Sequence, residues 1–391
     1  MNLRKRDSLG YAAIALAGAA LAFLVYLKTE EDYTAALQGY RDTSLDEAKN
    51  VAKTLETSLT DIYQNLRTIA FLPGVQKIDR HGDNLGADGH TSIQQIYNNL
   101  ASAVAVSEVY VVPVELNPDA IDPATKQPEV PILMFDELIV GGGANAAGGS
   151  ADAGTPAADA ATGTSAAKPE EVEIYEYHLL QKQMEWLRQN YPDISKIKGL
   201  DLPFISGGEV ITCDNTEYDT TLKDADRKGV VLSVPFYGPD GRLKGTITAV
   251  VRTNNLKAML PKRDYALVNA DYGYQAVSVE GGQTTASASL VTAAKPDPRL
   301  LFSTVIPLAA NDPRSQWSVW VGHPDSDFWQ SPGVREIKNF AIYGYTFTAL
   351  LTLIGFAAWR SSLRHTRSVA ANSGKLESQL REIERLSRES T

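Results

Sequence analysis

Apolar and polar side chains alternate most clearly between residues 229 and 252, in two stretches separated by the letters GPDG. Alternation with a period of two is typical of a strand with one buried face, and the proline and glycines of GPDG favour a tight reversal. The pattern therefore predicts a β-hairpin of strands 229–237 and 246–252 with one apolar and one polar face. The polar face could hold a small molecule or be covered only by solvent. Its side chains include Ser233, Tyr237, Thr248 and Arg252.

Two uncharged apolar stretches, 9–27 and 340–359, are each long enough to cross a hydrocarbon core of about 30 Å as a helix. Basic residues flank their outer ends, namely Arg4, Lys5, Arg6, Arg360, Arg364 and Arg367. The positive-inside rule then predicts two membrane spans, with residues 1–8 and 360–391 in the cytoplasm and residues 28–339 on the far side. The first stretch exceeds the roughly 7 to 15 apolar residues of a signal-peptide core, so it predicts an uncleaved anchor rather than a signal peptide.

Between the first span and Pro73, apolar positions recur alternately three and four residues apart. They are Leu45, Ala48, Ala52, Leu55, Leu59, Ile62, Leu66 and Ile69. This seam predicts that the membrane helix continues outward as one long stem that ends near Pro73-Gly74. The seam could pair with a second copy or pack on the sheet of its own domain. We expect the second arrangement, because most amphipathic helices bury their apolar stripe within their own domain.

The rest of the outer region predicts a mixture of helices and strands. Periodicity indicates helices at 91–106, 171–190 and 255–260, an extended piece from 210, and strands at 108–116, 130–139, 265–269, 274–279, 301–308 and 316–322. The last four strands are expected to form a smaller second sheet. Residues 141–169 are almost entirely Ala, Gly, Ser, Thr and Asp, which predicts a flexible insertion. The expected fold class is α+β, with a long N-terminal stem helix and two sheets, bracketed by two transmembrane helices.

Composition narrows the possible functions. The formal net charge is −10 and no long Lys/Arg stripe occurs, so no nucleic-acid partner is expected. The single cysteine allows no intramolecular disulfide, and the five histidines show no metal-binding spacing, so no metal and no cofactor is expected. No nucleophile, base and orienting group fall into a known catalytic spacing, so the chain is not expected to be an enzyme.

Further candidate ligand residues precede the hairpin in sequence. Asp214 and Asp219 could face the amine of a ligand, although residues of this type more often cap turns. Trp186 lies off the apolar stripe of its predicted helix, either at the surface or over a pocket. The complete set of predicted ligand-binding residues is Tyr110, Trp186, Asp214, Tyr218, Asp219, Ser233, Tyr237, Thr248 and Arg252.

With its stem, hairpin, smaller sheet and two spans, the chain resembles bacterial receptors with a double Cache sensor region, over residues 28–335. The resemblance is most specific in LSVPFYGPDGRLKGTITAVV. It implies two PAS-like Cache modules in the periplasm, a membrane-distal one within 28–260 and a membrane-proximal one within 261–339, and a small ligand between the helices and the polar sheet face of the distal module. Amino-acid-binding members carry an acidic residue where this chain has Val250. Arg252 nearby suits a carboxylate, so a small organic anion is expected.

The expected function is that of a homodimeric sensory receptor in the bacterial inner membrane, which passes a ligand-dependent movement to a cytoplasmic output. Residues 383–388 resemble the helical lead into diguanylate cyclase domains, but no output domain is recognised in the chain. A cyclase or kinase is therefore expected elsewhere in the receptor or in a partner protein. The alternative is a membrane-anchored module that binds another protein and no small ligand, which an exposed apolar patch without an enclosed cavity would favour.

Overall fold

The structure, a computed structural model, describes residues 3–104, 106–136, 171–211, 227–278 and 295–389. Chain contacts divide the protein into two compact units, one made of Met1–Thr43 with Asp325–Thr391 and the other of Ser44–Pro324. The predicted insertion 141–169 lies outside the described residues, and so do the predicted ligand residues Asp214, Tyr218 and Asp219.

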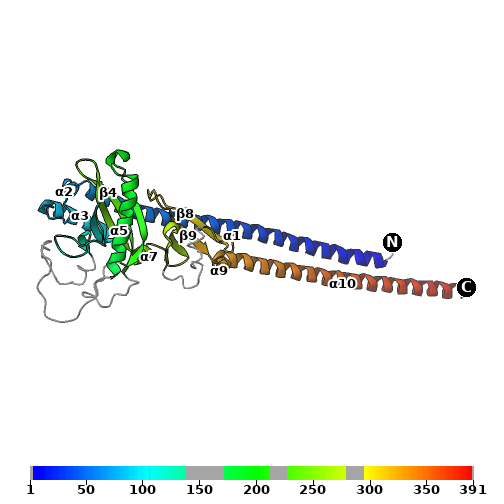
Figure 1. Cartoon of the computed structure of the whole chain (residues 1–391). Coiled ribbons are helices and arrows are strands. Elements are labelled where there is room, and N and C mark those ends of the chain that lie inside the picture. The colour runs from blue at the N-terminus through cyan, green and yellow to red at the C-terminus, as the bar shows by residue number, and fades with distance from the viewer. Residues whose placement is uncertain (1–2, 105, 137–170, 212–226, 279–294, 390–391) are drawn as a thin grey trace, which may run out of the picture. The chain divides into compact units, whose positions relative to one another are not determined.

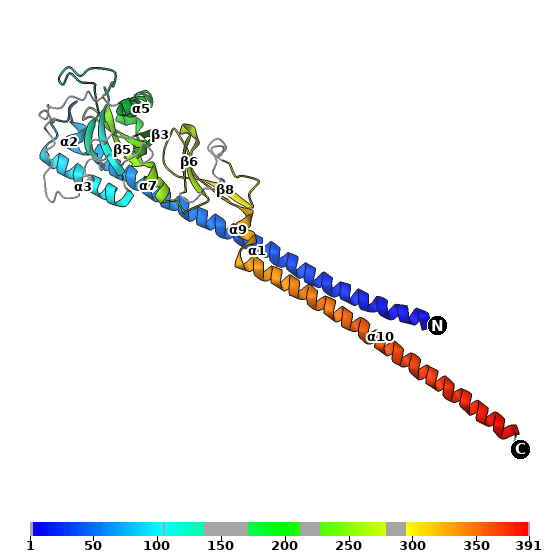
Figure 2. The same ribbon diagram turned by 90° about the horizontal axis from the view of Figure 1, so that it is seen from below.

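The first unit consists of helices. They are α1 (Leu3–Ala70), of which only the part up to Thr43 belongs to this unit, α9 (Asp325–Trp329) and α10 (Pro332–Glu389). α1 and α10 each contain an apolar segment long enough to cross a membrane, and only 0% and 6% of these segments is buried. The two helices run antiparallel and side by side (Figures 1 and 2), with Gly10 against Trp359 and Gly18 against Thr352. Small residues at such contacts let two membrane helices approach closely, so the unit is consistent with a two-pass membrane protein.

The second unit begins with the remainder of α1, whose apolar seam is buried within this unit. The exposed fraction is at most 1% for Ala48, Leu55, Ile62, Leu66 and Ile69. The prediction that the seam packs within its own domain is confirmed, because a single chain already removes these side chains from water. The stem is one continuous helix up to Ala70, and Pro73 begins the short helix α2 (Pro73–Gln76).

The larger sheet of this unit is antiparallel, with the strand order β2-β1-β5-β4-β3. Its strands are β1 (Val106–Pro113), β2 (Ile132–Asp136), β3 (Ile205–Ile211), β4 (Lys228–Tyr237) and β5 (Leu243–Arg252). The predicted hairpin is β4 with β5. Ser233 pairs with Thr248 across it, and Gly241 in the turn has a φ of +77°, which glycine adopts without strain. β1 is an inner strand, and its pairing with β5 is irregular between Val106 and Glu108.

The smaller sheet has the strand order β7-β6-β9-β8. Its strands are β6 (Tyr265–Asn269), β7 (Tyr274–Val277), β8 (Phe302–Pro307) and β9 (Trp317–His323). The four strands predicted for a second sheet are thus confirmed. Trp317 and Trp320 on β9 are each 1% exposed, and Trp320 packs with Ala266 and Val268, so both tryptophans serve the core. Short helices complete the unit, namely η1 (Ile194–Lys196), α7 (Thr253–Ala258) and η3 (Ala270–Tyr272).

Two longer helices pack on the larger sheet (Figures 1 and 2). α3 (Ala87–Val104) contacts β1 and β2, whereas α5 (Glu171–Asn190) contacts β3 and β5. α5 covers the polar face of the hairpin, and its Leu180, Met184 and Leu187 are at most 2% exposed. The alternative of a polar face covered only by solvent is therefore wrong, because every residue of β4 from Gly229 to Tyr237 is buried.

Candidate ligand site

A cluster of buried hydroxyl groups lies between the hairpin and α5. The Ser233 hydroxyl donates to Gln183 Oε1 at 2.7 Å and lies 2.8 Å from Thr248 Oγ1, which in turn lies 3.2 Å from Thr246 Oγ1. Because Ser233 and Thr248 are paired directly across β4 and β5, their side chains point to the same face. We call Gln183, Ser233, Thr246 and Thr248 the hydroxyl cluster. All four are at most 2% exposed.

Gln183 connects this cluster to α5. Its side-chain oxygen accepts the Ser233 hydroxyl, while its Nε2 has no hydrogen-bond partner among the described residues. A buried amide N–H is costly to leave without an acceptor, so this position offers a donor that a polar molecule could satisfy. Periodicity of apolar residues did not mark Gln183, because a buried glutamine interrupts the stripe that identifies a helix face.

Tyr110, one of the predicted ligand residues, lies on the same face and contacts Glu108, a residue that no sequence pattern singled out. Tyr110 pairs with Thr248 across β1 and β5, and its hydroxyl donates to Glu108 Oε2 at 2.8 Å. Both side chains are at most 1% exposed. An acidic residue in an otherwise apolar strand was the available signal for Glu108.

Further charged groups lie toward the end of the sheet where β5 finishes. Glu176 is fully buried and Arg227 is 5% exposed, while Arg252 is half-buried and pairs with Gly229. We call Glu108, Glu176, Arg227 and Arg252 the charged end. Each of the four has an interaction partner.

The position of Glu176 follows from the direction of α5. Gln183 of α5 meets Ser233, and Tyr191 just after α5 accepts the hydroxyl of Tyr237 at 3.2 Å, so the helix runs in the direction of β4. Seven residues back from Gln183 is about 10 Å along a helix, which equals about three residues of a strand. Glu176 therefore lies near the level of Val230, at the same end as the pair of Gly229 with Arg252.

The remaining predicted residues do not join the hydroxyl cluster. Tyr237 and Arg252 each lie four residues from the central Ser233–Thr248 pair but in opposite directions, which is about 13 Å along a strand. Burial raises the pKa of Tyr237, and its hydroxyl is bonded to backbone, so it anchors the end of α5. Trp186 is half-buried, with its ring 5.7 Å from that of Tyr191 and the Arg314 guanidinium 5.2 Å above it.

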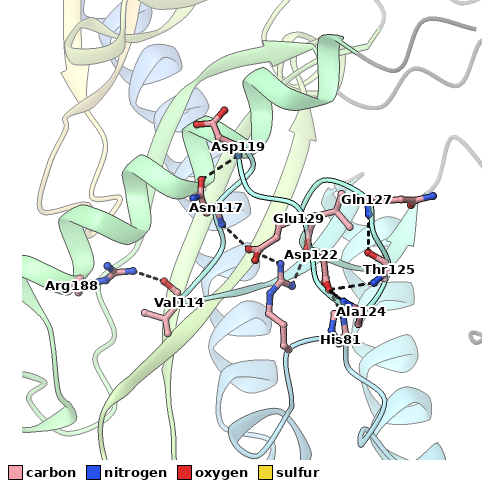
Figure 3. A network of polar contacts seen from close by, with 12 residues as sticks. His81, Val114, Asn117, Asp119, Asp122, Ala124, Thr125, Gln127, Glu129 and Arg188 are labelled. Carbon is pink, nitrogen blue, oxygen red and sulfur yellow. Dashed lines mark hydrogen bonds and ion pairs between the residues drawn. The ribbon is translucent and has the colours of Figure 1, made fainter.

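A second polar network lies in the loop between β1 and β2 (Figure 3). Glu129 accepts the backbone N–H of Asn117 at 3.0 Å and pairs with Arg80 at 3.2 Å. Asp122 accepts the N–H of Ala124 at 2.7 Å, and this hydrogen bond lowers the pKa of the carboxyl group although burial opposes it. These carboxylates satisfy the backbone of the loop itself, so the network has a structural role.

No protein-family model matches the chain, and no curated protein matches it. Solved structures to which it is similar are ligand-binding sensory domains. One is the ligand-binding domain of an amino acid chemoreceptor from Pseudomonas aeruginosa in complex with GABA, 12% identical, covering 73% of this chain and 100% of its own, with a TM-score of 0.39. Another, from a Campylobacter jejuni chemoreceptor in complex with L-valine, is 11% identical, covering 76% and 97%, with a TM-score of 0.39. A third, from a Pseudomonas fluorescens chemoreceptor in complex with L-isoleucine, is 11% identical, covering 75% and 97%, with a TM-score of 0.39.

The hydroxyl cluster offers donors and acceptors without charge, and the charged end offers carboxylates and guanidinium groups toward the end of the sheet where β5 finishes. Buried groups of this kind are costly to desolvate, and they concentrate at sites that bind polar molecules, although structural ion-pair networks share this property.

Proposed function

We propose that the chain is a sensory receptor of the bacterial inner membrane, in which residues 28–339 lie in the periplasm and bind a small polar ligand beneath α5. The supporting observation is the row of buried polar groups that follows the α5-covered face from the hydroxyl cluster to the charged end. A face needed only for packing would be stabilised by apolar side chains, as the opposite face of the same hairpin is.

The composition of the charged end refines the ligand. Arg252 suits a carboxylate through two parallel hydrogen bonds, as the organic-anion prediction requires. Glu108 and Glu176 lie toward the same end of the sheet and are fully buried, so a ligand that also carries an ammonium or hydroxyl donor would complement the site better than a simple anion.

The signal in this proposal travels along α1 and α10. α1 is continuous from the first apolar segment into the second unit, so a shift of the stem would reach the membrane without a break. The ligand must bind one of two arrangements more tightly than the other for this to occur. We propose a homodimer as the signalling form, because Leu376, Leu380 and Ile383 of α10 form an apolar stripe at least 55% exposed. A cytoplasmic output domain or partner protein, such as a cyclase or kinase, would receive the movement.

A thermal-shift screen on the full chain in phospholipid nanodiscs tests the ligand proposal, with amino acids and small organic acids as the compounds. A ligand present at 100 times its Kd stabilises the native state by about 2.7 kcal/mol, which corresponds to a rise in Tm of roughly 5 to 10 °C. We expect Arg252→Gln to abolish this rise. Arg242→Gln is the matched control, because Arg242 is 85% exposed in the hairpin turn.

Two results would contradict the proposal. One is that none of the amino acids and organic acids tested raises the Tm. The other is that a compound raises the Tm of Arg252→Gln as much as that of the unaltered chain.

The topology is tested separately with a reporter fused near Asp201, which must report a periplasmic location. A cytoplasmic location would remove the receptor interpretation.

A further inference from the structure

The connection between β8 and β9, residues 308–316, has a shape determined by its own hydrogen bonds. Asp312 Oδ1 accepts the N–H of Arg314 at 2.8 Å, and Asp312 Oδ2 accepts the Ser315 hydroxyl at 2.7 Å. Gln316 Nε2 donates to the carbonyl of Leu308 at 2.8 Å and so closes the base of the loop. A loop held in this way can transmit a displacement instead of absorbing it.

This loop, with the first residue of β9, binds Ser206 of the larger sheet. The N–H of Ser206 donates to Asp312 Oδ2 at 3.0 Å, and the hydroxyl of Ser206 accepts the indole N–H of Trp317 at 2.7 Å. Ser206 is fully buried and Trp317 is 1% exposed. Hydrogen bonds to a carboxylate are stronger than those between neutral groups, so the smaller sheet holds this one residue of β3 by both its backbone and its side chain.

The same stretch of β3 contacts α5. The pairing of β3 with β4 is irregular between Ser206 and Glu209, where two glycines occur. A Cβ on Gly207 would lie 2.9 Å from Leu179 Cδ2 and 3.0 Å from Gln183 Nε2, so α5 packs directly on the backbone there. Gln183 belongs to the hydroxyl cluster, and the neighbouring Ser206 is bonded to loop 308–316. This irregular stretch of β3 is therefore in contact with the cluster on one side and with the loop on the other.

Arg314 adds a direct contact between the loop and α5. Its guanidinium carbon lies 5.2 Å from the centre of the Trp186 ring and 6.0 Å from the centre of the Tyr272 ring. Trp186 belongs to α5, and Tyr272 belongs to η3 beside the smaller sheet. The cation is therefore attracted to aromatic rings on both sides of the boundary between the two sheets.

We infer that loop 308–316 is a coupling element that makes the position of the smaller sheet depend on the position of α5. Asp312 and Arg314 are its positioning residues, and Ser206 and Trp186 are the groups that they hold. This coupling deepens the proposed function, since it supplies a route from the candidate ligand site to the smaller sheet. The coupling itself exists without ligand, so its test does not depend on finding one.

Hydrogen exchange of the full chain in phospholipid nanodiscs, read by mass spectrometry, tests the coupling. We expect Asp312→Asn to speed exchange in β3 and α5 by roughly 10-fold or more, because a charge-assisted bond to the backbone of β3 is lost, while α3 stays unchanged. Coupling is reciprocal, so Trp186→Leu must in turn speed exchange within residues 308–316. Arg314→Met provides the same readout should Asp312→Asn fail to fold.

Asp297→Asn is the matched control, because Asp297 pairs with Arg299 within the smaller sheet's own region at 2.7 Å. We expect Asp297→Asn to speed hydrogen exchange only near residues 297–303. Faster exchange confined to residues 308–316 in Asp312→Asn would overturn the inference, and so would an unchanged loop in Trp186→Leu. A uniform acceleration over the whole unit would also count against it, since that result indicates general loss of stability.

Discussion

The bond between Ser233 and Gln183 offers a direct test of the hydroxyl cluster. Ser233→Ala removes a hydroxyl with two partners, at 2.7 Å from Gln183 Oε1 and 2.8 Å from Thr248 Oγ1. Thr248 keeps its contact with Thr246, but the Gln183 oxygen stays buried without its donor. Leaving such a group unsatisfied costs about 1–3 kcal/mol, and we expect a loss of stability in that range. The corresponding fall in Tm is roughly 2–4 °C for each kcal/mol in a unit of this size.

Gln183→Met keeps the length of the side chain and removes both polar atoms, and by itself should cost about 1–2 kcal/mol. When both changes are combined, no acceptor is left without its donor, so the double variant should be less destabilised than the sum of the single variants by about 1 kcal/mol or more. Denaturant unfolding of the full chain in nanodiscs measures all four free energies. Gln183→Met combined with Ser303→Ala is the control, because Ser303 donates to Val321 in the smaller sheet and shares no bond with Gln183. In the control pair, the loss of stability of the double variant should equal the sum of the two single losses within about 0.5 kcal/mol. The same additivity for Ser233→Ala and Gln183→Met would refute the bond between these two side chains as the source of the coupling.

Three further outcomes are expected. Gly245→Ala should destabilise by about 3 kcal/mol or more in denaturant unfolding, because its Cβ would collide with the carbonyl of Val112 and the ring of Phe236; a loss below 1 kcal/mol would contradict this packing. Gly39→Ala should stabilise α1 by about 0.5–1 kcal/mol, since a Cβ there meets nothing within 4 Å, and a lower Tm would speak against it. Burial raises the pKa of Tyr265 to about 12, so its contribution to stability is complete below pH 10 and is lost as the pH rises through 12. Tyr265→Phe should therefore flatten the alkaline fall of the unfolding free energy, and an unchanged slope would count against this assignment.

Local patterns explain which parts of the fold could be predicted. The GPDG turn and the alternation around it identify β4 and β5, since a proline and two glycines favour reversal whatever surrounds them. The seam of the stem was equally clear, because a long repeat leaves only one face of α1 apolar. The position of β1 was harder. β1 is an inner strand with irregular pairing, and strand order depends on contacts between distant residues.

The site could be predicted only in part. Tyr110, Ser233 and Thr248 were predicted as ligand residues from strand alternation, which assigns each residue to a face, and the structure brings these three together. Glu108, Gln183 and Glu176 were not predicted, because a polar residue in a helix or strand is read from sequence as solvent-exposed. Only the packing of α5 on the sheet shows that these side chains are buried.

By itself, the amino-acid order determined two apolar helices, a continuous stem, an alternating hairpin and a second small sheet, since each follows from a period that neighbouring residues repeat. Tertiary structure alone decided that α5 closes over the polar face and that Arg314 lies between Trp186 and Tyr272. Such contacts join positions 42 to 128 residues apart, and no local pattern predicts that these residues come into contact. The physical reason is that burial and pairing of polar groups depend on the whole packed unit, whereas periodicity depends only on the chain.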